Sequence, residues 1–351
     1  MSTRLTVAVT GMNARPDNPG PGLAVARCLT EATDIECRIV GLSYDALDPG
    51  LYLREYCDAG YLLPYPSTGE DALIQRLAEI HDNERIDILI PCLDAELPGM
   101  IRSEPVIRQM GINTFLPSAD QLKLRNKDQL PLLAEHAGLK CPRITAITDI
   151  HFFDTCKDDD WNYPLVIKGL FYDARVVYAV DQARQAFRSI AAEWGYPVLV
   201  QEFVKGQEYN LTALGDGDGN MVSAVMMKKM ALTDKGKAWA GVTIADDTLY
   251  EASERLIRRI KWRGPLEVEV LKDGKGDYHL LEINPRFPAW IYLSHGVGRN
   301  VPAALLKTIQ GIPQDGAQEI RPGIMFIRYA NEVILPIGEF ENYVVSGSNH
   351  F

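Results

Sequence analysis

The chain reads GPLEVEV at residues 264–270 and YHLLEINPR at residues 278–286, separated by a short turn that contains DGKG at 273–276. Apolar and polar residues alternate in both segments, which predicts two adjacent antiparallel strands. Alternate side chains of a strand lie on one face, so Glu282 and Asn284 should point the same way. Glu269 can meet them from the neighbouring strand.

These three oxygen-bearing side chains predict a magnesium site, because Mg²⁺ takes few protein ligands and completes its shell with water and phosphate. Arg286 follows the strand and is placed to meet an anion held by that metal. An exposed acidic hairpin is the alternative interpretation. The apolar neighbours of Glu282 favour a buried strand, in which a carboxylate needs a partner or a metal. Glu267 shares a face of the strand with Glu269, so Glu267 could be the magnesium ligand instead of Glu269.

The composition is that of a soluble globular protein large enough for two or three domains, with 351 residues, 46% of them hydrophobic and 24% charged. A formal net charge of −11 argues against nucleic acid or an anionic membrane as the main partner. The six cysteines show no CxxC spacing, which favours free thiols in a reducing cytoplasm over disulfides or zinc. The first apolar stretch is too short for a signal peptide, and no apolar run approaches membrane-spanning length.

Residues 1–117 alternate strand and helix patterns, which predicts an open, doubly wound α/β sheet. The expected strands are 5–9, 36–42 and 86–92, and the expected helices are 23–29 and 71–81. The loop after the first strand lacks Gly-x-Gly-x-x-Gly, so we reject a dinucleotide site. Ligands still favour the carboxyl ends of such strands, where Asp94 and Glu96 follow residues 86–92. Both are candidates to face a substrate, or they merely connect elements.

Residues 118–204 begin with a capping box, from Ser118 to Gln121, and a helix over 127–136 that Asn126 caps. The compact unit at 139–204 is the candidate for a closing lid. Its expected elements are strands at 164–168, 175–180 and 197–202 and a helix at 182–194, with Trp194 on the inner face. Further on, the patterns predict strands at 208–214 and 221–230, a helix at 247–261, and strands at 323–329 and 333–337.

Four pieces in this order carry a resemblance to a known family: Lys127, the segment YPLVIK ending at Lys168, the segment VQEFVKGQEY at 200–209, and the hairpin of 264–286. The ordered set resembles the ATP-grasp superfamily, particularly its carbamoyl-phosphate-synthase-like and biotin-carboxylase-like branch, over most of the chain. The fold implied is α/β and α+β. It has a Rossmann-like pre-ATP-grasp domain at 1–117 and a two-lobed ATP-grasp fold, with the linker and lid lobe at 118–204 and the catalytic lobe at 205–351.

The resemblance implies ATP and Mg²⁺ (or Mn²⁺) as cofactors and assigns roles to matching residues. Arg286 would stabilise the transferred phosphoryl group or the acyl phosphate. Lys127 and Lys168 would contact the ATP phosphates. Glu202, Phe203 and Val204 would bind the adenine, and Glu208 would hydrogen-bond the ribose. Glu269, Glu282 and Asn284 would bind magnesium. Alternatively, Lys127 and Glu208 are ordinary surface residues. A surface role is less expected for Lys168, because it follows a buried apolar run.

One departure from the family lies at residues 169–175, where a glycine-rich flap is expected to cover the phosphates. The sequence there is GLFYDAR, with a single glycine. Either the flap is shortened and Arg175 supplies charge in place of backbone amides, or the flap is degraded. The presence of all three metal-ligand types favours an active enzyme.

The function implied is an ATP-dependent ligase that joins a small carboxylate to an amine through an acyl phosphate and releases ADP and phosphate. One alternative is a carboxylase-type enzyme that activates bicarbonate. Another is a nucleotide-binding regulatory protein on a decayed ATP-grasp fold. Dimers are common in the resembling family, which makes a homodimer an expectation.

Overall fold

The computed structural model describes residues 4–169, 173–314 and 321–350. Its contacts divide the chain into two compact units. The first unit contains the residues up to Lys123, Asn210–Val268, and the residues from Ile283 onward, and the second contains Leu124–Tyr209 and Glu269–Glu282. Part of the predicted flap, residues 170–172, lies outside the described residues.

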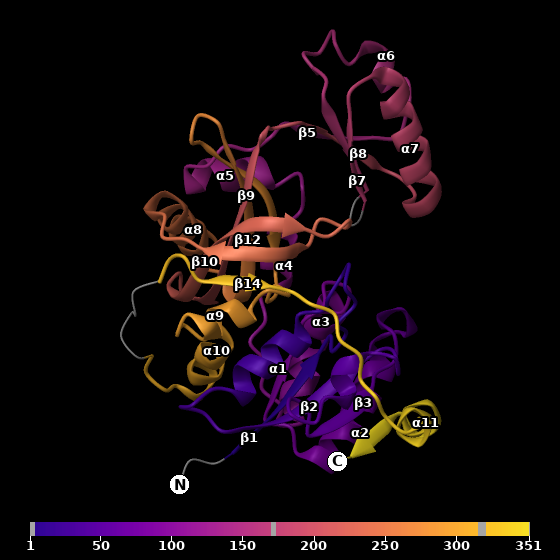
Figure 1. Cartoon of the computed structure of the whole chain (residues 1–351), viewed down its shortest axis with the longest axis vertical. Coiled ribbons are helices and arrows are strands. Elements are labelled where there is room, and N and C mark those ends of the chain that lie inside the picture. Colours follow the sequence, from indigo (N-terminus) through magenta and orange to yellow (C-terminus); the bar gives the residue numbers. More distant parts are fainter. Residues whose placement is uncertain (1–3, 170–172, 315–320, 351) are drawn as a thin grey trace. The chain divides into compact units, whose positions relative to one another are not determined.

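The first unit begins with a doubly wound sheet whose strand order is β15-β3-β2-β1-β4 (Figure 1). Neighbours among the first four strands of the chain pair in parallel, as the alternating pattern predicts. β15 is the antiparallel edge strand. The bounds are β1 (Leu5–Thr10), β2 (Cys37–Ser43), β3 (Ala59–Leu62), β4 (Ile88–Ile90) and β15 (Ser348–His350).

The helices of this sheet are α1 (Gly22–Thr30), α2 (Glu70–Glu84) and α3 (Leu97–Gln109). The helix expected at 71–81 is confirmed as α2, which is amphipathic and buries Leu73, Leu77 and Ile80. Two short 3₁₀ helices, η1 (Pro49–Tyr52) and η2 (Pro66–Thr68), lie in the connections around β3. The capping box at Ser118 is also confirmed, because Gln121 N donates to Ser118 Oγ (3.1 Å) and Ser118 N to Gln121 Oε1 (2.8 Å). It opens α4 (Ala119–Leu124).

The C-terminal segment returns to this sheet as α11 (Ile337–Ser346) and β15. Tyr343 of α11 is fully buried, and its hydroxyl donates to the carbonyl of Leu51 (3.1 Å). The predicted strand at 333–337 is wrong. Val333 and Leu335 pack against the core while Ile334 is 93% exposed, so the segment alternates without pairing to another strand. Pro336, which has no N–H to donate, precedes the helix.

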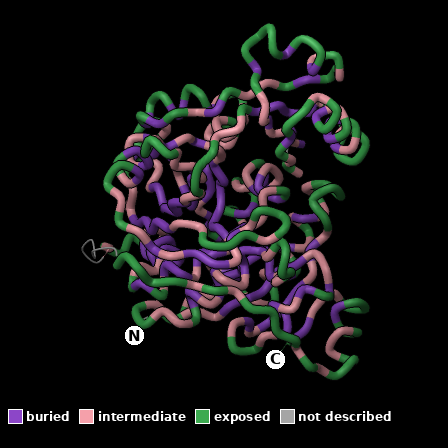
Figure 2. The backbone as a smooth tube through the Cα atoms, turned by 45° about the horizontal axis from the view of Figure 1, so that its top comes forward, coloured by how far each residue is buried: buried purple, intermediate pink, exposed green. Residues whose placement is uncertain are grey.

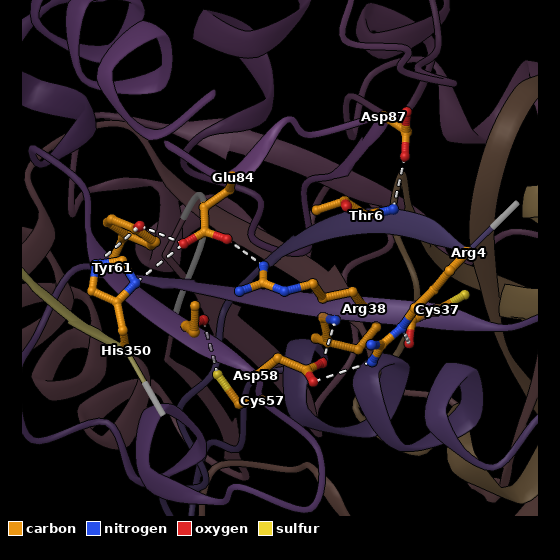
Figure 3. A network of polar contacts seen from close by, with 12 residues as sticks. Arg4, Thr6, Cys37, Arg38, Cys57, Asp58, Tyr61, Glu84, Asp87 and His350 are labelled. Atoms are coloured by element: carbon orange, nitrogen blue, oxygen red, sulfur yellow. Dashed lines mark hydrogen bonds and ion pairs between the residues drawn. The ribbon is translucent and has the colours of Figure 1, made fainter. Parts of the chain in front are cut away.

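Figure 3 shows the polar network that fastens this return. The Glu84 carboxylate accepts from the hydroxyl of Tyr61 (2.6 Å), forms an ion pair with Arg38, and lies 3.3 Å from Nδ1 of His350. The Glu84 side chain is only 5% exposed. A buried carboxylate needs such partners, so the last strand and α2 are joined through one acidic side chain.

The first unit also carries most of a six-stranded sheet with the order β13-β12-β9-β10-β11-β14. The predicted hairpin of 264–286 is confirmed as β12 and β13. The bounds are β9 (Gly206–Asp216), β10 (Met221–Leu232), β11 (Ala238–Thr243), β12 (Arg263–Asp273), β13 (Tyr278–Asn284) and β14 (Met325–Ile327). The accompanying helices are α8 (Asp247–Ile260), α9 (Tyr292–Gly296) and α10 (Val301–Gln310).

The second unit contains an antiparallel sheet with the order β5-β8-β6-β7 and its own apolar core. Its helix α7 buries Ala183, Ala186, Phe187 and Ile190, but Trp194 is 48% exposed, so its predicted inward position is wrong. Trp194 is the last residue of the helix. The bounds are β5 (Ile144–Ile147), β6 (Leu165–Lys168), β7 (Ala174–Val177), β8 (Val198–Glu202), α5 (Leu130–Ala137), α6 (Phe152–Thr155) and α7 (Val180–Trp194).

Two predicted boundaries in the second unit differ from the structure by three residues. The strand expected at 175–180 ends at Val177, because Val180 already begins α7. The helix expected at 127–136 starts at Leu130, and Lys127 lies in the preceding turn. A proline, Pro131, stands in the first turn of α5, where its missing N–H costs nothing, and fixes the later start.

Figure 2 shows buried and exposed stretches alternating along the backbone. Most residues of β1, β2 and β8 belong to the buried stretches. In the described part of the chain, no helix combines the length and the apolarity that a membrane crossing requires.

Candidate functional site

Two of the predicted functional residues contact each other in the second unit. Lys127 Nζ lies 3.2 Å from Glu282 Oε1, which joins a predicted phosphate ligand to a predicted magnesium ligand. The Lys127 side chain is 20% exposed and that of Glu282 44% exposed. Lys127 is therefore not an isolated surface lysine. The contact is made by the turn before α5 and the end of β13.

Lys168 ends β6, half-buried, and its ammonium donates to Gln201 Oε1 on β8 (2.9 Å). Burial, followed by the positive charge of Lys127, lowers the pKa of Lys168 from 10.5 to about 8. Three carboxylates act in the opposite direction and favour the charged form: Glu282, Glu269 and Glu208. Four of the other predicted ligands thus lie within electrostatic reach of Lys168, one cationic and three anionic.

The predicted adenine-reading segment follows β8. Glu202 is exposed at the strand end, where its backbone N–H donates to the carbonyl of Arg143 (2.9 Å). Phe203 and Val204 are half-buried between β8 and β9. The β6–β8 register pairs Leu165 with Glu202 and Lys168 with Leu199. Glu202 and Lys168 therefore stand at opposite ends of one strand pair, about 10 Å apart along the strand.

Arg175 lies on β7 and forms two contacts with Asp173, at 2.8 Å from Nη2 and 3.3 Å from Nε. This hydrogen bonding raises the pKa of Arg175. The carboxylate of Asp173 neutralises the guanidinium. If Arg175 replaces the backbone amides of the flap as a source of positive charge for the phosphates, its ion pair with Asp173 must open, or both side chains must take part.

In the first unit, Glu267 of β12 gathers four donors and is 4% exposed. Its Oε1 accepts from Asn210 Nδ2 (2.6 Å) and Trp290 Nε1 (2.6 Å). Its Oε2 accepts from Asn284 Nδ2 (3.1 Å) and Arg286 Nη1 (3.4 Å). Two residues with predicted roles, Asn284 and Arg286, thus share one buried carboxylate oxygen.

Arg286 is also held by the first sheet. Its Nε donates to Asp94 Oδ2 (2.9 Å), and Asp94 follows β4. Nearby, Glu96 is 2% exposed and accepts from Tyr44 (2.5 Å), from the backbone N–H groups of Cys92 (2.8 Å) and Leu93 (2.9 Å), and from Thr10. Burial raises the pKa of Glu96, and these hydrogen bonds oppose that shift. Of the two interpretations left open, Glu96 fits the structural one, whereas Asp94 meets a predicted catalytic residue.

The predicted magnesium ligands are distributed over one hairpin. Glu269 and Glu282 belong to the second unit, and Asn284, at the end of β13, to the first. Over the described ranges, no group of three or more histidine, cysteine, aspartate or glutamate side chains could hold a metal ion. The predicted set is of a different kind, with two carboxylates and one amide. An all-oxygen donor set fits a hard cation such as Mg²⁺.

Sequence reasoning missed the contacts of Asn210 and Trp290 with Glu267. Neither residue lies in a recognisable motif, and both reach Glu267 from elements distant in sequence, β9 and the loop before α9. The alternation of residues along β9 predicts which face of the sheet carries Asn210, but it does not predict that Asn210 contacts Glu267.

Comparisons with known proteins bear on the fold. The model of a family described as "ATP-grasp in the biosynthetic pathway with Ter operon" matches residues 196–332. A biotin carboxylase–β,γ-ATP complex from Campylobacter jejuni has a TM-score of 0.69 at 17% identity, over 91% of this chain and 74% of that chain. The biotin carboxylase domain of a 2-oxoglutarate carboxylase from Hydrogenobacter thermophilus, with MgADP, ADP and bicarbonate, scores 0.68 at 14% identity, over 93% and 74%.

An L-amino acid ligase from Bacillus licheniformis is also similar, with a TM-score of 0.64 at 15% identity, over 92% of this chain and 78% of that chain. At such identities the likeness establishes the fold. The family model covers two of the pieces on which the resemblance depends, the segment at 200–209 and the hairpin of 264–286. The resemblance stated from the sequence is therefore confirmed: this chain has the ATP-grasp fold, and among ATP-grasp proteins it resembles the biotin carboxylases and amino acid ligases.

Proposed function

We propose that this protein is an ATP-dependent ligase that joins a small carboxylate to an amine through an acyl phosphate. The observation that carries the proposal is the cluster in the second unit, where Lys127 contacts Glu282 and the charges of Glu269, Glu282 and Glu208 act on Lys168. Cations for phosphate oxygens and carboxylates for a divalent cation are the two sets of groups that phosphoryl transfer from ATP needs. The similarity to an amino acid ligase supports the same class.

In the proposed reaction, a substrate carboxylate oxygen attacks the γ-phosphorus of ATP, and the bond between that phosphorus and the β-phosphate oxygen breaks. The amine then attacks the acyl carbon, loses a proton, and phosphate leaves. Lys127 and Lys168 would hold the phosphates, and Arg286 would face the transferred phosphoryl group. Mg²⁺, held by Glu269, Glu282 and Asn284, would neutralise phosphate charge. Water must be kept out, or the acyl phosphate hydrolyses.

The test is an assay of ADP and phosphate release over a panel of carboxylates and amines, with Mg-ATP present throughout. We expect release that requires both a carboxylate and an amine. Glu282→Gln should lower it by about 100-fold or more, because it removes a charged cation ligand. Glu251→Gln, the same change on the exposed face of α8, should leave it unchanged.

The other outcomes discriminate the alternatives. Release that needs bicarbonate but no amine would favour the carboxylase-type reaction, to which the similarity with biotin carboxylases also points. Nucleotide binding without turnover over the whole panel would favour a regulatory protein. The absence of any nucleotide binding would overturn the proposal. A homodimer and a cytoplasmic location stay predictions, and light scattering of the purified chain tests the first.

A further inference from the structure

Glu267 differs from the other carboxylates of the β12–β13 hairpin in what surrounds it. Each of its two oxygens accepts from two side-chain N–H groups, all within the first unit. A cation ligand must turn an oxygen lone pair toward the metal, and here the nearest groups are positively polarised hydrogens. The surroundings of Glu267 are therefore those of an anchor for other side chains and a poor place for Mg²⁺.

The contact with Asn284 fixes which end of that amide faces the carboxylate. A side-chain amide has one donor end and one acceptor end, and the two are distinguished by their hydrogen bonds. An ionised carboxylate can only accept, so the NH₂ end must face Glu267 Oε2 at 3.1 Å. The reverse orientation would bring two oxygens together in a site that is almost fully buried. The carbonyl end of Asn284, the end that binds a hard cation, is thereby turned away from Glu267.

The same oxygen sets the position of Arg286, which is 9% exposed and lies between two carboxylates. Its Nη1 reaches Glu267 Oε2 (3.4 Å), and its Nε reaches Asp94 Oδ2 (2.9 Å). A guanidinium held along two edges loses rotational freedom before any substrate arrives, which is how a charged group is preorganised. One carboxylate oxygen thus orients both residues.

We propose that Glu267 is a positioning residue whose carboxylate turns the carbonyl oxygen of Asn284 toward the nucleotide-bound cation and holds Arg286 beside it. This inference rests on the proposed function, since it presumes a bound Mg-nucleotide. It also assigns the two acidic residues of β12 different tasks, with Glu269 toward the cation and Glu267 toward the protein.

The experiment measures Mn²⁺ binding to the full-length protein in the presence of ADP, by the electron paramagnetic resonance signal of free Mn²⁺. Glu267→Gln keeps the shape of the side chain but places an NH₂ group against one set of donors. We expect it to weaken Mn²⁺ affinity about tenfold, the effect typical of losing a group that orients a ligand. Glu251→Gln, the same change on the exposed face of α8, should leave the affinity within about twofold of wild type.

A reciprocal exchange separates orientation from simple loss of structure. In Glu267→Gln/Asn284→Asp the donor and the acceptor change places, so the N–H···O contact is kept and the total charge is unchanged. We expect this double variant to recover Mn²⁺ affinity to within about threefold of wild type. It also decides the matter if Glu267→Gln alone does not fold, because a folded exchange variant that has lost tenfold in affinity would overturn the inference.

The outcomes distinguish this inference from the proposed function. If wild type binds Mn²⁺ with ADP and a folded Glu267→Gln binds it equally well, the positioning role is overturned and the proposed function stands. An exchange variant no better than a folded, weakened Glu267→Gln overturns it too. If wild type does not bind Mn²⁺ with ADP at all, the proposed function fails, and this inference fails with it.

Discussion

Lys168 is the residue whose charge the fold alters most directly among the predicted phosphate ligands. Its pKa is lowered from 10.5 to about 8, first by burial and then by Lys127. The unfolded chain therefore binds more protons than the folded one between about pH 8 and 10.5, and stability rises with pH in that window. Below pH 8 the cost of the partly buried ammonium is fully present. That ammonium is unfavourable alone and becomes favourable once phosphates lie beside it.

This balance predicts proton uptake on nucleotide binding. At pH 8.5 a group with a pKa near 8 is about three-quarters deprotonated, and a triphosphate would raise that pKa, so binding should take up as much as about 0.75 proton per site. Calorimetric titration with ATP in two buffers of different ionisation enthalpy measures the uptake. Lys168→Arg is the control, because a guanidinium stays charged and should bring the uptake close to zero. Equal uptake by the two proteins would contradict the prediction.

Among elements, α11 depends on a glycine that lies in another part of the chain. A Cβ atom at Gly60 of β3 would overlap the phenolic oxygen of Tyr343 and lie 2.9 Å from its Cζ. Tyr343 also stacks edge-on against Tyr52, with ring centroids 5.2 Å apart. The close approach of the strand to this ring is possible only because residue 60 has no side chain.

We therefore expect Gly60→Ala to loosen α11 and to lower the free energy of unfolding by about 1–3 kcal/mol, the usual cost of an overpacked site. Tyr343→Phe, the control, loses only the hydrogen bond to Leu51 and should cost about 1 kcal/mol. Combined, the two changes should cost less than their sum, because removing the hydroxyl removes part of the overlap. Hydrogen exchange at residues 337–350 and urea unfolding measure both effects. Full additivity would indicate that α11 does not rest on this contact.

The periodicity of apolar residues was enough to predict the elements that carry a regular apolar pattern of their own. The strands of the first sheet, the amphipathic face of α2 and the β12–β13 hairpin follow from local patterns, and the structure differs mainly at their ends. The prediction failed where packing at a distance decides. Residues 333–337 alternate like a strand but pair with none, and Trp194 keeps the helical spacing of the buried residues but is 48% exposed at the end of α7.

At the scale of the whole molecule, the C-terminal segment completes the first sheet. Deleting residues 337–351 should expose the edge of β3, which β15 covers through pairs such as Asn349 with Gly60, and should uncover the ring of Tyr52. We expect a lower melting temperature and concentration-dependent association through the open edge. Scattering and thermal melting at two concentrations test this. Val345→Ser, a change at an 86% exposed position of α11, should have neither effect.

The candidate site shows the same division between what is local and what is not. The motifs around Lys168, Glu202 and the hairpin could be located from the sequence, because each is a short segment with a strand pattern of its own. The anchoring of Arg286 could not, since Asp94 is 192 residues away and Glu267 looks equivalent to Glu269 in the pattern. Only tertiary burial separates those two acids.

The pairing of β15 with β3 has a consequence for the order in which the protein is built. On the ribosome, β1 to β4 emerge early, but the strand that caps their sheet is not available until residues 348–350 have been synthesised. Between the synthesis of β3 and that of β15, the nascent chain carries a bare β3 edge, which is a surface that chaperones and neighbouring nascent chains can pair with. Slowing synthesis should therefore raise the yield of misassembled protein rather than lower it.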